Sequence, residues 1–277
     1  MKKLGALILL TFASACGNDV PENSDKVESI LYLGAGDNQP LVVGLGGSEG
    51  GNAWTSDRWK VKRDEFIGKG YAFLAIGYFG AKDTPEVLDR ISIDAVHKAI
   101  MDASKNSKVD GNKIALIGGS KGAELALLLA SHYKDITCVI ALVPSHCSFP
   151  ALTLSASTSS WTYKGEEVPY VPMPWAAVPS AMKRDLHSAF TIMLEDKEAV
   201  EKALLKVENI NGAILLLSAK KDEMWPSTEM SNEVVLRLKQ KEFRHPYQHI
   251  VIDGGHTDVV DHFDTIFKFL GENFPAN

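Results

Sequence analysis

Short apolar runs alternate with longer stretches of mixed polarity along most of the chain. Seven runs have the length and composition of buried strands, and they lie at residues 27–33, 40–45, 71–77, 113–118, 136–143, 213–218 and 247–252. Between several of these runs, apolar residues recur at helical spacing, as at Ile93, Val96 and Ile100. Strands that alternate with helices predict an α/β fold, with a mostly parallel sheet covered by helices on both faces.

The sequence Gly118-Gly119-Ser120-Lys121-Gly122 joins the fourth run to an apolar stretch, residues 123–130, that only Glu124 interrupts. Strand, Gly-x-Ser-x-Gly and helix in this order are typical of a nucleophile elbow, a sharp turn that exposes a serine hydroxyl at a strand end. Glycines are needed on both sides because strand and helix pass close together there. A plain turn is the alternative, but the flanking strand and helix favour a catalytic Ser120.

A serine nucleophile needs a base and a carboxylate that orients the base, and in this architecture both follow it in the chain. Asp222 comes just after the sixth apolar run, and His256 comes just after the seventh. Both therefore lie where open parallel sheets place their sites. Glu223 is an alternative acid, whereas Asp253 is interpreted as a turn former beside a glycine. The sequence predicts a triad of Ser120, Asp222 and His256.

The second apolar run leads into the glycine-rich stretch 46–51. Glycines let backbone N–H groups approach a substrate oxygen closely. We expect an oxyanion hole built from the backbone N–H groups of Ser48 and Lys121, with Gly47 the next candidate. A flexible surface loop and a phosphate-binding loop are the alternatives. The latter is disfavoured because no Gly-Lys-Ser/Thr closes the stretch.

The stretch at 144–190 is rich in proline and carries a Ser/Thr-rich run with interleaved aromatic residues. A disordered linker is one interpretation, but linkers seldom carry so many aromatic side chains. We expect a cap at about residues 145–200 that covers the nucleophile elbow and lines an apolar acyl pocket. Trp161 within this cap, Trp225 beside the acid and Gly47 are the predicted pocket residues.

Composition narrows the class of partner. The net charge is −6, from 29 Lys and Arg against 35 Asp and Glu, which argues against a nucleic-acid partner. The basic residues Arg58, Lys60, Lys62 and Arg63 are interpreted as a solvated helix face rather than an anion site. Two cysteines beyond Cys16 imply no disulfide framework, and no His or Cys spacing indicates a metal site. We expect a small-molecule acyl substrate, no cofactor and no metal.

The first residues resemble a bacterial lipoprotein signal. Met1-Lys2-Lys3 precedes an apolar stretch too short to span a bilayer, and Ala13-Ser14-Ala15 then offers a cleavage site directly before Cys16. We expect Cys16 to be lipidated, and an ordinary secretory signal cut at the same bond is the alternative. The predicted location is the cell envelope, with membrane contact only through this anchor. The expected segments are a signal peptide at 1–15, a tether at 16–26 and a single domain at 27–277.

Six stretches of the sequence, taken in order, resemble the catalytic domain of one known family. They lie at residues 46–51, 75–80, 117–125, 160–165, 222–227 and 255–256, and Ser-Lys-Gly-Ala-Glu and Trp-Thr-Tyr-Lys-Gly are the most specific pieces. The family is that of the acyl-CoA thioester hydrolases and the bile acid-CoA:amino acid N-acyltransferases, and the resemblance covers roughly residues 40–272. It implies an α/β-hydrolase fold with a cap between the sixth and seventh strands of that fold, and a triad of Ser120, Asp222 and His256.

The resemblance also bears on the reaction. Family members with a serine nucleophile hydrolyse acyl thioesters, whereas those that transfer the acyl group to an amino acid use cysteine. The resulting hypothesis is a serine hydrolase that cleaves an acyl ester or thioester through an acyl-enzyme intermediate. Acyl transfer to an amine or alcohol is the alternative. A binding protein that kept the fold without catalysis is a third, and the Ser/Asp/His set with its glycine loop weighs against it.

Overall fold

The computed structural model describes residues 20–276 of the chain. The signal peptide predicted at 1–15 and the lipidation site Cys16 lie outside these residues, as does the first part of the predicted tether. Within 20–276, no helix is both long enough and apolar enough to cross a bilayer.

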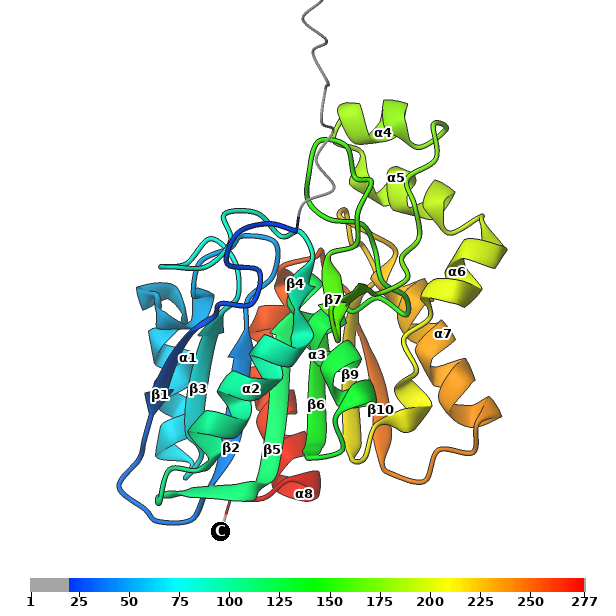
Figure 1. The fold of residues 1–277 in the computed structure, drawn as a ribbon. Coiled ribbons are helices and arrows are strands. Elements are labelled where there is room, and N and C mark those ends of the chain that lie inside the picture. The colour runs from blue at the N-terminus through cyan, green and yellow to red at the C-terminus, as the bar shows by residue number, and fades with distance from the viewer. Residues whose placement is uncertain (1–19, 277) are drawn as a thin grey trace, which may run out of the picture.

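A seven-stranded sheet forms the centre of the molecule (Figure 1). Its order is β1-β3-β2-β5-β6-β9-β10, and every neighbouring pair is parallel except β1 with β3. The seven predicted strands are therefore confirmed, with bounds β1 Glu28–Tyr32, β2 Gln39–Leu45, β3 Ala72–Gly77, β5 Val109–Gly119, β6 Ile136–Leu142, β9 Ala213–Ala219 and β10 Tyr247–Ile252.

Both faces of this sheet are apolar because successive side chains of its central strands point to opposite sides. Leu41 and Val43 belong to one buried cluster and Val42 to the other. The first cluster packs under α2 (Ile93–Ser104), α3 (Lys121–His132) and α7 (Ser227–Gln240). The second cluster packs under α1 (Asp57–Gly68) and α8 (Phe263–Asn273). Three short 3₁₀ helices, η1 Ala53–Thr55, η2 Val207–Asn209 and η3 Asp258–Asp261, lie in connections. The predicted α/β architecture is confirmed.

The chain between β6 and β9 forms a separate group of elements at the carboxyl end of the central strands (Figure 1). It holds β7 Trp161–Tyr163, β8 Glu166–Glu167, α4 Val178–Met182, α5 Leu186–Met193 and α6 Lys197–Ala203. β7 also pairs with β4 Ile91–Ser92 to make a second, three-stranded sheet. A third buried cluster, which includes Phe149, Met193 and Trp225, fixes this group to the main domain. Its role as a cap stays a prediction.

Candidate active site

Ser120 occupies a sharp turn between the end of β5 and the start of α3. Its backbone has φ 54° and ψ −120°, a conformation that non-glycine residues adopt only where the surrounding structure imposes it. A Cβ at Gly118 would lie 2.1 Å from the carbonyl oxygen of Gly122. One at Gly122 would lie 2.3 Å from the carbonyl oxygen of Gly46. Strand, helix and glycine loop therefore pack backbone against backbone around the serine.

The first turn of α3 contains a buried ion pair beside this serine. The ammonium group of Lys121 donates to both carboxylate oxygens of Glu124 at 2.9 Å, and the two residues are 3 % and 0 % exposed. Glu124 also accepts from the indole N–H of Trp161 at 2.6 Å and from the backbone N–H of Phe149 at 3.3 Å. Burial lowers the pKa of Lys121, and the charge of Glu124 opposes that shift. Because a buried charge is tolerated only when paired, these contacts hold the elbow rigidly against the core.

Asp222 and His256 meet across two loops at the carboxyl ends of β9 and β10. His256 Nδ1 donates to Asp222 Oδ1 at 2.8 Å, and the same oxygen accepts from the backbone N–H groups of Met224 and Trp225. Burial by itself would raise the pKa of Asp222, but the hydrogen bond and positive charge of His256 outweigh it and hold the pKa below its usual value. The carboxylate is therefore ionised at neutral pH and can orient the imidazole.

The two alternative acids have other contacts. Glu223 Oε2 accepts from the backbone N–H of His256 at 2.9 Å, so its carboxylate holds the loop rather than the ring. Asp253 forms an exposed ion pair with Lys221 at 2.9 Å. The acid that contacts the imidazole in this structure is Asp222.

Ser120 and His256 line the same cleft, which has a volume of about 370 Å³. In the described part of the chain, no hydrogen bond joins the Ser120 hydroxyl to His256, and such bonds often tighten only when substrate is bound. The wall is largely apolar and comes from η1, α1 and the loops after β6, β9 and β10. Its apolar side chains are Leu45, Ala53, Trp54, Trp59, Leu142, Val143, Met224, Val259 and Val260.

The glycine loop forms the side of the cleft nearest the serine. Gly46, Gly47 and Ser48 line it, and a Cβ at Gly47 would lie 3.4 Å from the Cβ of Ser120. Lys121 is the first residue of α3, and the first N–H groups of a helix have no partner within the helix. This placement suits the predicted oxyanion donors, the backbone N–H groups of Ser48 and Lys121, whose role stays a prediction.

Gly47, Trp161 and Trp225 were expected to line the substrate pocket. Gly47 lines the cleft, but the two tryptophans do not. Both tryptophans are buried, and neither is among the cleft residues, nor is any residue of 145–200. A buried indole N–H needs an acceptor. Glu124 provides one for Trp161, and the Val143 carbonyl oxygen provides one for Trp225 at 3.0 Å. These bonds turn the rings inward, although the Trp225 ring still packs beside His256.

Arg58 is a cleft residue that sequence reasoning missed. It is exposed on α1, as expected for a solvated helix face, and it also lines the cleft with its guanidinium carbon 5.7 Å from the ring centre of Trp59. Arg63 is buried and donates to the Trp54 carbonyl oxygen, whereas Lys60 and Lys62 pair with acidic neighbours on α1. The adjacent aromatic residue was the available signal, because arginine commonly stacks on such rings.

No site for a metal ion is visible in residues 20–276, since they contain no group of three or more His, Cys, Asp or Glu side chains arranged to hold one. The groups at the cleft include a serine, an imidazole with its carboxylate partner, and backbone N–H groups. Such a set can perform acyl transfer through a covalent intermediate.

Comparison with solved structures shows the fold at low sequence identity. A puromycin-hydrolyzing peptidase of Mycobacterium tuberculosis superposes with a TM-score of 0.62 at 14% identity, over 89% of this chain and 37% of that one. The acylaminoacyl peptidase of Pyrococcus horikoshii gives 0.62 at 14% identity, over 88% and 39%. A family profile described as an alpha/beta hydrolase of unknown function also matches residues 24–147. The protein has the α/β-hydrolase fold.

Sequence comparison adds the family. Acyl-coenzyme A thioesterase 5 of Mus musculus is 26% identical over 223 residues, which are 79% of this chain and 49% of the mouse protein. Acyl-coenzyme A thioesterase 1 of Rattus norvegicus is 27% identical over 221 residues, again 79% and 49%. The chain thus spans about half the length of these relatives. The profile described as "BAAT / Acyl-CoA thioester hydrolase C terminal" matches residues 92–259, more than half of the chain. The chain belongs to the family of BAAT and acyl-CoA thioester hydrolase C-terminal domains.

Proposed function

We propose that this protein is a serine hydrolase that cleaves an acyl thioester or ester, with Ser120 as nucleophile. The observation that carries the proposal is the 2.8 Å contact of His256 Nδ1 with Asp222 Oδ1 at the cleft that Ser120 also lines. The strained turn at Ser120 supports it, because strain of this kind concentrates at functional positions. The thioesterase names of the relatives support the thioester as the substrate class.

The proposed reaction has two acyl-transfer steps. His256 takes the proton of Ser120 as the hydroxyl attacks the acyl carbonyl, and Asp222 stabilises the imidazolium that forms. Backbone N–H groups at Ser48 and Lys121 stabilise the oxyanion, and loss of one such donor typically costs about 3 kcal/mol of barrier. His256 then protonates the leaving thiol or alcohol. Water repeats the sequence on the acyl-enzyme and releases the acid.

The cleft suggests how a substrate binds. Trp54, Trp59 and Val260 offer apolar surface for an acyl chain, and Arg58 offers a positive charge for an anionic part of the leaving group. Arginine is well suited to carboxylate and phosphate groups. A coenzyme A thioester has both features, as does any acyl ester with an anionic leaving group.

Labelling with a fluorophosphonate probe tests the serine. We expect the protein to be labelled and to hydrolyse a series of acyl thioesters and p-nitrophenyl esters, and Ser120→Ala to lose both properties. Ser29→Ala, an exposed serine on β1, is the matched control and should behave as the parent protein. Labelling and hydrolysis that persist in Ser120→Ala would exclude this proposal. Product analysis with glycine or hydroxylamine present separates hydrolysis from acyl transfer.

We further propose that the protein is exported and anchored through Cys16, which places its substrate in the cell envelope. The support is the charged start, short apolar stretch and small-residue site before that cysteine. Incorporation of labelled palmitate in the producing cells should depend on Cys16 and be lost in Cys16→Ser. Equal incorporation in both proteins would overturn the anchor.

A further inference from the structure

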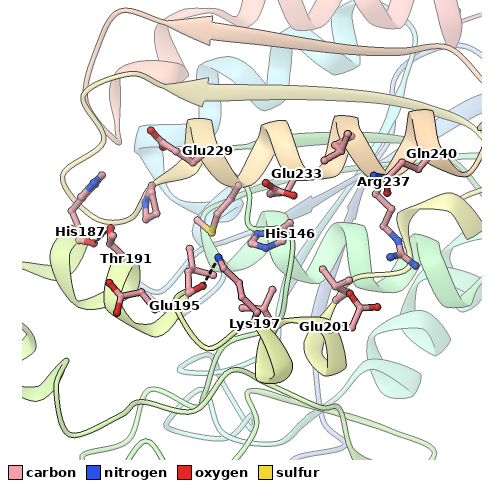
Figure 2. A pocket seen from close by; sticks show the side chains of 16 residues that line it. His146, His187, Thr191, Glu195, Lys197, Glu201, Glu229, Glu233, Arg237 and Gln240 are labelled. Atoms are coloured by element: carbon pink, nitrogen blue, oxygen red, sulfur yellow. Dashed lines mark hydrogen bonds between the residues drawn. The ribbon is translucent and has the colours of Figure 1, made fainter.

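A second and larger cavity, of about 710 Å³, shares no lining residue with the catalytic cleft. Figure 2 shows its two walls, with α7 on one side and the chain of α5 and α6 on the other. None of Ser120, Asp222 or His256 lines it. It does reach the loop after β9 that carries Asp222, because Pro226 and His187 line it. His187 Nδ1 donates to the Asp222 carbonyl oxygen at 2.7 Å. Its volume is within the range of small-molecule sites.

The rim of this cavity is acidic. Glu229 and Glu233 lie one turn apart on α7, and Glu195 and Glu201 lie on the opposite wall (Figure 2). Within residues 20–276, none of these four carboxylates forms an ion pair with a lysine, arginine or histidine. Two like charges at this spacing on a helix repel each other. A cation bound between the walls would reduce that repulsion.

The two cations of the lining do not neutralise the rim. Lys197 donates to the carbonyl oxygen of Leu194 at 2.9 Å (Figure 2). Arg237 is held by both oxygens of Glu208, a residue outside the lining. The hydrogen bond and charge of Glu208, and then the charge of Glu201, raise the pKa of Arg237. The lining therefore has four carboxylates against one lysine and one arginine, and Glu208 and Glu201 share the charge of that arginine. This balance disfavours phosphate and carboxylate ligands and favours a cation.

His146 supplies the second observation. Its side chain lines the cavity and is 7 % exposed, and neither ring nitrogen has a hydrogen-bond partner among the described residues, with Nδ1 fully buried. Burial, and then the charge of Lys197, lowers the pKa of His146 to about 4. The imidazole is thus neutral at pH 7, and because Nδ1 is fully buried, only Nε2 can accept a hydrogen bond from a ligand in the cavity. Val200, Leu204 and Met230 supply apolar surface beside it.

We propose that this cavity binds a primary alkylammonium ligand, with the charged group among the glutamates and His146 and the alkyl body on the apolar surface. An N–H cation can pair with the rim carboxylates and also donate to His146 Nε2, whereas a quaternary ammonium can only pair with the carboxylates. The site is separate from the acyl site and does not depend on the proposed hydrolase activity.

Isothermal titration calorimetry of the purified protein tests this with hexylammonium, hexyltrimethylammonium and hexanoate. We expect hexylammonium to bind, hexyltrimethylammonium to bind several-fold more weakly and hexanoate not to bind. The double variant Glu229→Gln/Glu233→Gln should weaken hexylammonium binding about tenfold, because two exposed charges one turn apart on the same wall are removed. Glu272→Gln, an exposed glutamate on α8, is the matched control and should bind as the parent protein.

The outcomes separate the parts of the proposal. Equal affinity for hexanoate, or hexylammonium binding unchanged in the double variant, would overturn the site. Equal affinity for the primary and quaternary ions would overturn the role of His146. Ser120→Ala should bind hexylammonium like the parent protein, so a failure of the hydrolase proposal leaves this result unaffected.

Discussion

Ser120 and His256, the proposed nucleophile and base, are held in different ways. Ser120 starts a helix whose first turn is sealed in the core by the ion pair of Lys121 with Glu124. His256 lies in a loop after the edge strand β10, where the adjacent carboxylates of Asp222 and Glu223, in the loop after β9, accept its ring and backbone N–H groups. The nucleophile is thus positioned by packing and the base by hydrogen bonds near the surface. Substitutions in the buried contacts beneath Ser120 should therefore lower the stability of the fold. Substitutions around His256 should instead lower the rate of catalysis.

The largest effect is expected at Asp222. In the proposed mechanism, Asp222→Asn removes the charge that stabilises the imidazolium, so it should reduce kcat by about 10³–10⁴-fold, the loss typical of this change in Ser-His-Asp enzymes. Steady-state hydrolysis measures this, and circular dichroism should show a folded protein. Asp253→Asn, which loses only an exposed pair, should retain parental activity. A nearly active Asp222→Asn protein would show that the base end does not depend on this carboxylate.

A substitution in the buried ion pair beside Ser120 should instead lower the stability of the protein. Lys121→Met leaves Glu124 buried without its cation and should reduce the free energy of unfolding by about 3–5 kcal/mol, measured by urea denaturation. Lys60→Met breaks an exposed pair on α1 and should leave stability almost unchanged. A Lys121→Met protein as stable as the parent would remove the distinction between the two ends.

The base end should also give the protein an acid-sensitive stability. The pKa of Asp222 is lowered in the folded chain, so below pH of about 4 the unfolded chain takes up a proton that the folded chain does not. Unfolding free energy should therefore fall with falling pH, by up to about 1.4 kcal/mol per pH unit from this group. Denaturation between pH 5 and 3 should show a steeper decline for the parent than for Asp222→Asn. Parallel declines would contradict the assignment.

The smallest effect concerns Glu223. Glu223→Gln keeps an oxygen that can accept from the backbone N–H of His256 but loses the charge, so kcat should fall by less than about tenfold. The unfolding midpoint should not move, because the side chain is exposed. A large loss of stability in Glu223→Gln would show that this contact supports the fold as the buried contacts do, which would contradict the difference drawn between Ser120 and His256.

The strands of the main sheet could be predicted because each is a compact apolar run. The prediction missed the start of β5 at Val109, because Asp110-Gly111-Asn112 has the composition of a turn. In the structure these residues belong to the strand, and the register of its pairing with β2 shifts there. The prediction also missed β4, β7 and β8, because strands of two or three residues leave no periodic pattern.

The order of motifs and strands along the chain was enough to predict the loops that form the site. The direction in which individual side chains point could not be predicted from the sequence. The elbow and the loops after β9 and β10 follow from motif and strand position, and the structure brings Asp222 and His256 into contact. The position of Trp161 could not be predicted, because an aromatic residue indicates burial without saying which neighbour takes its N–H. Arg58 lines the cleft through the packing of α1, which no local pattern encodes.

The contact between Glu124 and Trp161 joins residues 37 positions apart, and it has a consequence for how the molecule assembles. During synthesis, residues 121–132 are made before Trp161. Until Trp161 is in place, Glu124 cannot accept the indole hydrogen bond that it has in the folded protein. Completion of the contacts beneath Ser120 therefore depends on a segment that contributes no residue to the cleft wall.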